Sequence, residues 1–190
     1  MIQILFALLL ATSLTAVEQI TNFKSDITIL QDGSMQVRED ITVQVEGRQV
    51  RRGIVREFPT IYKDRMGNRY TVGFTVGRVL MDGKAIGFFI ETAQNGKYLN
   101  FGDDRFLSHG LHTFTVEYIT NRQLGYFDEH DELYWNVTGT GWRLPIAHAS
   151  ATVHLPDTIP ADAIRSQAYT GGYGSRDKYV SIQKQVHGVT

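Results

Sequence analysis

The chain has 190 residues, 42% of them hydrophobic and 21% charged, so it is long enough to bury the core of one soluble domain. Its 19 basic and 20 acidic residues leave a formal net charge of −1, which gives no sign of the sustained basic surface that nucleic-acid binding needs. Cysteine is absent, which excludes disulfides, thiolate metal sites and cysteine nucleophiles.

The N-terminal stretch 1–16, MIQILFALLLATSLTA, differs from everything after it. Ile2 to Leu14 is nearly all apolar, with Gln3 as the main polar break, and Ala16 is a suitable residue before a cleavage site. This length suits the helix of a signal peptide and is short for a membrane span. We therefore predict export and an extracytoplasmic location, periplasmic or on the cell surface. A buried N-terminal element and an uncleaved anchor are the alternatives.

Period-two alternation dominates the region after the leader. The clearest run places Met35, Val37, Ile41, Val43 and Val45 on one face of a strand, with polar side chains between them. Similar runs occur over 70–76, 86–90, 112–118 and 147–155. One apolar and one polar face is the pattern of a strand in a two-layer antiparallel structure.

Turn signals fall between these runs. Asp32-Gly33, Asp82-Gly83 and Asn95-Gly96 each predict a tight hairpin, because Gly and Asn tolerate positive φ angles. No long segment has helical spacing. The sequence thus predicts an all-β fold, an antiparallel β-sandwich of immunoglobulin-like or jelly-roll-like type, over residues 17–160. Residues 161–190 are expected to form a glycine-rich connection and one last strand, over 178–185, of an incomplete domain end.

Basic residues are concentrated between positions 48 and 78, where only Glu57 and Asp64 oppose them. They are Arg48, Arg51, Arg52, Arg56, Lys63, Arg65, Arg69 and Arg78. The simplest explanation is that these side chains face water or pair with the acids of segment 117–132. The functional alternative is a patch that binds anionic lipid headgroups or an acidic envelope polymer.

Three of these arginines are candidate binding residues. Arg51, Arg52 and Arg56 flank Gly53, and a guanidinium can hold a carboxylate or phosphate through two parallel hydrogen bonds. The same side chains could instead tie their loop to the acids near residue 130. We favour this structural role.

Aromatic residues gather in DELYWNVTGTGW, residues 131–142. Tyr134, Trp135 and Trp142 could form a platform on which sugars stack, whereas a Trp in a β-sandwich more often fills the core. We favour core filling, and exposure of the two Trp side chains distinguishes these alternatives.

Metal and catalytic motifs are weak or missing. Asp128, Glu129, Asp131 and Glu132 are hard oxygen ligands that would suit calcium, but their spacing does not match an EF-hand, so a solvated acidic loop is favoured. The sequence contains no GxSxG elbow, no HExxH helix and no P-loop. We expect no cofactor, no metal and no enzymatic activity.

Four motifs together resemble a known family. They are DGSMQVRED (32–40), RRGIVREFP (51–59), GLHTFTVEYIT (110–120) and DELYWNVTGTGW (131–142). In this order and spacing they are similar to the N-terminal domain of the YciQ-like predicted membrane proteins, a domain of unknown function (domain of unknown function 2207). The resemblance implies a signal sequence, an extracytoplasmic β-rich domain and membrane-spanning segments later in the chain. It implies no catalytic or ligand-binding residue.

This chain departs from the family pattern, because no apolar stretch long enough to span a bilayer follows the β-region. It is then either a fragment or a shortened relative, and we expect segment 176–190 to be poorly ordered or to contact another chain. The leading functional hypothesis is a non-enzymatic interaction module of the cell envelope, whose partner is another envelope protein or the missing membrane region. The alternative is a carbohydrate-binding module or glycan-directed enzyme built around Trp135 and Trp142. Docking on anionic lipid through residues 48–78 is a third hypothesis.

Overall fold

The computed structural model describes residues 16–190 apart from 65, 157, 172–174, 176, 178 and 186–187. The predicted signal peptide therefore lies outside the described residues except for Ala16. The prediction of an all-β fold is confirmed, because the one helical element of the described part of the chain is a single 3-10 turn, Ala161–Ala163.

The larger of two main sheets, here the large sheet, has eight strands. In spatial order they are β14 (Lys184–Gln185), β15 (Gly188–Val189), β13 (Ala149–His154), β1 (Gln19–Ile29), β2 (Met35–Val45), β10 (Gly110–Thr120), β6 (Phe74–Met81) and β7 (Lys84–Ala85). The small sheet has three strands, β3 (Gly53–Pro59), β9 (Gly96–Gly102) and β8 (Phe88–Ala93), in that order. Two short ribbons complete the list, β4 (Ile61–Lys63) with β5 (Arg69–Thr71) and β11 (Leu124–Tyr126) with β12 (Asp131–Leu133).

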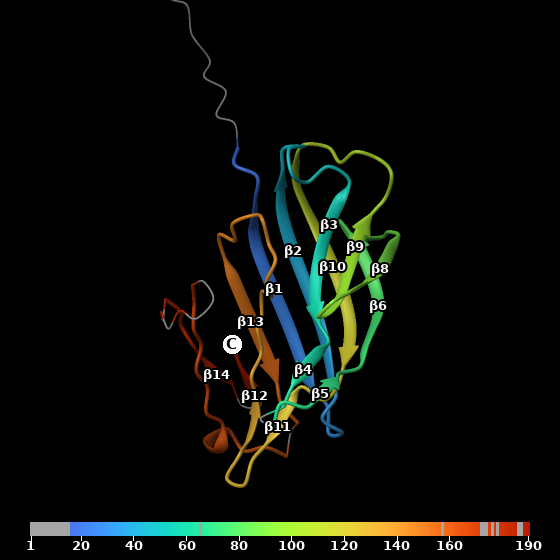
Figure 1. Ribbon diagram of the computed structural model, residues 1–190. Coiled ribbons are helices and arrows are strands. Elements are labelled where there is room, and N and C mark those ends of the chain that lie inside the picture. Colours follow the sequence, from blue (N-terminus) through green and yellow to red (C-terminus); the bar gives the residue numbers. More distant parts are fainter. Residues whose placement is uncertain are drawn as a thin grey trace, which may run out of the picture.

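The two main sheets lie one over the other, with the small sheet across β2, β10 and β6 (Figure 1). Alternation explains the contact between the layers. Met35, Val37, Ile41, Val43 and Val45 are all buried on the inner face of β2, as their spacing predicts. The small sheet contributes inward side chains to the same core, namely Ile54, Phe58, Leu99 and Phe101.

The small sheet is too narrow to cover the whole inner face of the large sheet. The second layer also includes the irregular segment 134–144, which lies in front of the large sheet between β1 and β13 in Figure 1. Residues 145–148 then hydrogen-bond to β1 and lead into β13. The side chains Trp142 and Leu144 of segment 134–144 pack against the core. A segment without strand alternation therefore covers part of the large sheet, as a further strand of the second layer would.

The prediction that all strands run antiparallel is wrong at one place. β1 and β13 are parallel, with Phe23 opposite Ala149 and Ile27 opposite Val153. Segment 134–148 carries the chain back across the sheet, so that β13 enters in the same direction as β1. Side-chain alternation is the same in both orientations, and the sequence pattern therefore does not contain this information.

Hairpins form at all three predicted places, but the positive φ angles predicted for Asn95-Gly96 are not found there. Asp82 and Gly83 have φ angles of +50° and +78° in the turn between β6 and β7. The β8–β9 turn consists of residues 94–95, and Gly96 already begins β9. Gly96 is needed for close approach instead, because an added Cβ would lie 2.1 Å from the carbonyl oxygen of Phe58.

The C-terminal segment joins the large sheet. β15 pairs with β13, so that sheet contains strands from both sides of residue 160. Of the last strand predicted over 178–185, the described residues show only β14. The expectation that segment 176–190 is poorly ordered or contacts another chain stays a prediction.

A buried carboxylate holds the loop between β2 and β3. Glu18 accepts hydrogen bonds from the backbone N–H groups of Glu46, Gln49 and Val50. Burial raises the pKa of the Glu18 carboxyl, but these N–H donors outweigh it, and the net pKa lies below the usual value of 4.5. Glu18 thus ties the start of the described β-region to the connection that leads into the small sheet.

We expect Glu18→Gln to lower the free energy of unfolding by about 1–3 kcal/mol at neutral pH, since an amide is a weaker acceptor for three N–H donors. Because the folded pKa is depressed, this stabilisation is present above about pH 4.5 and is lost as the pH falls through the folded pKa. Urea denaturation at several pH values measures it. A difference between the two proteins that does not change with pH would show that the charge of Glu18 is not responsible.

Candidate functional site

A buried ion pair lies between the two main sheets. Arg56 on β3 donates from Nε and Nη2 to the two carboxylate oxygens of Glu39 on β2, each at 2.9 Å. Glu39 is 0% exposed and Arg56 is 2% exposed. The remaining polar capacity is used as well, since Arg56 Nη1 donates to the carbonyl oxygen of Glu57 and the hydroxyl of Tyr118 donates to Glu39, both at 2.9 Å.

Aromatic rings enclose this pair and keep water away from it. The Arg56 guanidinium lies 4.8 Å from the ring centre of Phe58 and 5.6 Å from that of Phe23. Burial raises the pKa of the Tyr118 hydroxyl well above its ordinary value, and the Glu39 carboxylate raises it further. Burial alone would lower the pKa of Arg56, but the Glu39 charge outweighs it and raises that pKa. Tyr118 therefore stays a hydrogen-bond donor to a charged pair.

All four motifs that characterise the sequence meet at this ion pair. Glu39, Arg56 and Tyr118 come from the first three, and the fourth supplies Gly139 and Trp142. An added Cβ at Gly139 would lie 1.8 Å from Arg56 Nη1, and the Trp142 ring centre lies 6.0 Å from the guanidinium. The motifs thus mark the structural centre of the domain.

The structural role predicted for Arg56 needs one correction. Its partner is Glu39 and not an acid near residue 130, and its donors point into the core, where no ligand from solvent reaches them. The sequence contained the signal for this partner. Glu39 sits at the buried position of the β2 alternation, between Val37 and Ile41, where an isolated carboxylate would be too costly without a cation.

We expect Arg56→Met to lower the free energy of unfolding by about 3–5 kcal/mol, because it leaves the Glu39 carboxylate buried without a cation. The double variant Glu39→Leu with Arg56→Met should recover much of this loss in urea denaturation. Arg78→Gln breaks an exposed ion pair with Glu117 and serves as the control, with a nearly unchanged urea midpoint. The single variant Glu39→Leu completes the comparison. If the double variant lost as much free energy of unfolding as the two single variants lose together, the result would contradict the pairing.

The other predicted arginines lie apart from this centre. Arg51 and Arg52 are exposed in the loop before β3, where the Arg52 guanidinium covers the ring of Phe106 at 4.7 Å. The basic stretch 48–78 does not form one patch on the described surface. Arg56 is buried, Arg78 pairs with Glu117 on the outer face of the large sheet, and the β4–β5 ribbon holds Lys63 and Arg69.

The three aromatic candidates do not share one exposed face. Tyr134 is 84% exposed, whereas Trp135 and Trp142 are half-buried and pack against the core. Trp142 Nε1 donates to the carbonyl oxygen of Thr138 at 2.8 Å, and its ring meets Phe23 edge-on. Core packing is therefore what the two Trp side chains do in this structure.

The acidic residues Asp128, Glu129, Asp131 and Glu132 are exposed around the β11–β12 turn. Within the described part of the chain, no group of three or more potential ligands is arranged to hold a metal ion.

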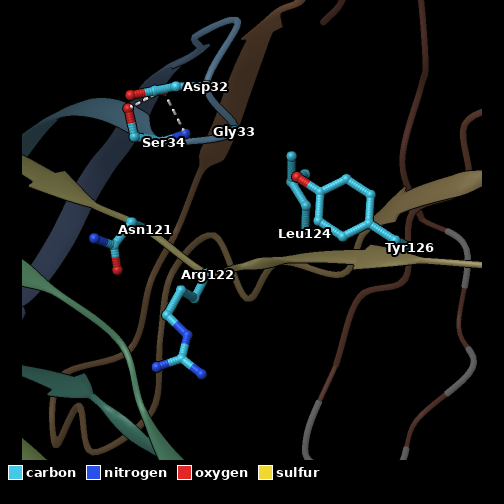
Figure 2. A pocket seen from close by; sticks show the side chains of 7 residues that line it. All are labelled: Asp32, Gly33, Ser34, Asn121, Arg122, Leu124 and Tyr126. Carbon is cyan, nitrogen blue, oxygen red and sulfur yellow. Dashed lines mark hydrogen bonds between the residues drawn. The ribbon is translucent and has the colours of Figure 1, made fainter.

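A cavity of about 320 Å³ lies where the β1–β2 turn approaches the β10–β11 turn. Figure 2 shows Asp32 and Ser34 on one turn, Arg122 on the other, and Leu124 beside Tyr126. The charged groups are engaged within the molecule. Asp32 accepts from Ser34, and Arg122 donates to the carbonyl oxygen of Thr71 at 3.3 Å. No ion pair joins Asp32 to Arg122 among the described residues.

The feature that the sequence interpretation missed is strand β8. The alternation over 86–90 predicted a buried face, yet Phe88 and Ile90 are each 40% exposed and Phe89 is 58% exposed. The reason is position, because β8 is the outermost strand of the small sheet and pairs only with β9 among the described strands (Figure 1). The signal in the sequence was FFI, a run of three consecutive large apolar residues. Because successive side chains of a strand point to opposite faces, such a run places apolar residues on both faces of β8.

Comparison with known proteins identifies the family. The profile described as "Predicted membrane protein (DUF2207) N-terminal domain" matches residues 19–189. The chain belongs to this family. This confirms the resemblance carried by the four motifs. No helix of the described residues is long and apolar enough to cross a bilayer.

A curated relative is the uncharacterised protein YciQ of Escherichia coli K12, which is 25% identical over 130 residues. The match covers 68% of this chain and 21% of YciQ, so the chain corresponds to about a fifth of that relative. Among solved structures, an M1 zinc metallopeptidase from Deinococcus radiodurans is similar at a TM-score of 0.42, with 14% identity over 90% of this chain and 37% of the peptidase. Native yeast LTA4 hydrolase is similar at a TM-score of 0.40, with 10% sequence identity over 56% of this chain and 15% of the hydrolase. Likeness at this level carries no argument about activity.

Proposed function

We propose that this domain is a non-enzymatic interaction module on the extracytoplasmic side of a membrane, and that it binds a protein partner at β8. The observation that carries the proposal is the open edge of the small sheet, where Phe88, Phe89 and Ile90 are exposed together. Adjacent exposed apolar residues on a strand with an unpaired edge are typical of a surface that another chain covers.

The opposite edge of the small sheet shows what a protected edge looks like in this domain. Segment 139–141 passes close to β3, such that an added Cβ at Gly139 or Gly141 would collide with the side chains of Arg56 or Glu57. β8 has no such cover among the described residues. Its sequence FFIETA also lacks the Lys and Pro residues that commonly protect edge strands.

The extracytoplasmic location is supported by two sequence features. The family is described as the N-terminal domain of a predicted membrane protein, and stretch 1–16 has the composition of a signal peptide. Both features favour a domain that leaves the cytoplasm and acts next to the membrane region of a larger protein.

A binding role fits the geometry better than catalysis. The Glu39–Arg56 pair is closed to solvent, and the charged side chains around the cavity of Figure 2 are hydrogen-bonded within the molecule. The carbohydrate-binding alternative has less support, because Trp135 and Trp142 pack on the core and leave Tyr134 as the exposed ring of this group. Docking on anionic lipid has less support as well, because the basic residues of 48–78 are dispersed.

The absence of cysteine allows a direct test with single-cysteine variants of the full chain. Phe89→Cys reports on β8, and Thr75→Cys reports on the exposed outer face of β6. With a membrane-impermeant maleimide, we expect Thr75→Cys to react equally fast in spheroplasts and in the purified protein. We expect Phe89→Cys to react several-fold more slowly in spheroplasts, because a partner covers the strand there.

Two results would contradict the proposal. Equal reaction rates of Phe89→Cys in spheroplasts and in the purified protein would show that nothing covers β8. Reaction of Thr75→Cys only after the cells are lysed would show that the domain is not exported.

A further inference from the structure

The core layer of the small sheet ends abruptly at β8. Three inward rows cross the small sheet, and in two of them the apolar side chain on β8 is left exposed. Along the first of these two, Ile54 and Phe101 are 5% and 2% exposed, whereas Phe88 is 40% exposed. Along the second row Leu99 is fully buried, whereas its neighbour Ile90 is 40% exposed. The rows are one strand too short, and a further strand beside β8 would complete both of them.

The outer face of β8 carries one carboxylate, Glu91, between Phe89 and Ala93. The register places Glu57, Tyr98 and Glu91 side by side in one row across β3, β9 and β8. No described Lys, Arg or His lies within ion-pair distance of either carboxylate. A strand added next to β8 would place its own outer side chain directly opposite Glu91, where a cation is favoured and an anion is disfavoured.

These two faces define the occupant. We infer that the β8 edge binds an extended peptide segment of a partner protein, which adds as a fourth strand with apolar side chains toward Phe88 and Ile90 and a Lys or Arg opposite Glu91. The inference rests on the proposed function and specifies the chemistry of its partner. Main-chain hydrogen bonds along the edge would supply affinity, and the alternation of apolar and basic residues would supply specificity.

A second copy of this chain fits the edge less well than such a segment. β8 has no basic residue, so pairing of two β8 strands would offer Glu91 no cation. The partner segment is therefore expected to differ from β8, with a length close to the six residues of that strand.

The test uses two capped peptides that read the same in both directions, so that strand orientation does not matter. Thr-Val-Lys-Val-Lys-Val-Thr is the basic probe, and Thr-Val-Glu-Val-Glu-Val-Thr is its acidic counterpart. We expect the basic probe to shift the ¹⁵N amide signals of residues 88–93 and to bind about fivefold more tightly than the acidic probe. Glu91→Lys should reverse the preference, and Thr75→Lys on the other sheet should leave it unchanged.

The outcomes separate this inference from the proposed function. Slow labelling of Phe89→Cys in spheroplasts together with equal binding of both probes would overturn the basic-segment inference and leave the interaction module in place. Shifts confined to residues outside 88–93 would overturn the inference as well. If Glu91→Lys does not fold, Glu91→Gln serves instead, and it should remove the preference without reversing it.

Discussion

The Glu39–Arg56 ion pair is the constraint on which the rest of this structure depends. Two charges without contact to water are tolerated only when their geometry is good and every donor and acceptor is used. Here both guanidinium-carboxylate bonds form, and Tyr118 and the Glu57 carbonyl use the remaining polar groups. A shift of β2 or β3 by one residue would move one charge to the opposite face and leave the other alone in the core. The pair therefore fixes the register of both layers.

The same pair explains why the four sequence motifs are so far apart in the chain and so close in space. Each motif supplies one part of the enclosure. Gly139 leaves space for the Arg56 guanidinium, because any larger residue at this position would place its side chain there. The motifs consequently report on how the domain is held together. They do not by themselves point to a binding surface, and in this structure the exposed apolar strand belongs to none of them.

Much of the fold could be predicted from the sequence, because alternation depends only on which side of a strand each residue faces. The buried face of β2 and the positions of all three hairpins follow from local pattern. Strand direction does not, and the parallel pairing of β1 with β13 therefore required the structure. The candidate site was less predictable. The sequence of β8 has the same alternation as a core strand. Phe88 and Ile90 are exposed because β8 is the edge strand of the small sheet.

The parallel pair also affects how the domain can assemble. β1 is synthesised first, yet one of its two neighbours, β13, lies more than a hundred residues later in the sequence. Until Ala149–His154 has been made, β1 can pair with β2 along one edge. Its other hydrogen-bonding edge has no strand to pair with during that time. Contacts between such distant parts of a chain form late and slow the folding of β-rich domains. The completed β-structure is thus a product of the whole polypeptide, and the growing N-terminal half must be kept from pairing with neighbouring molecules in the meantime.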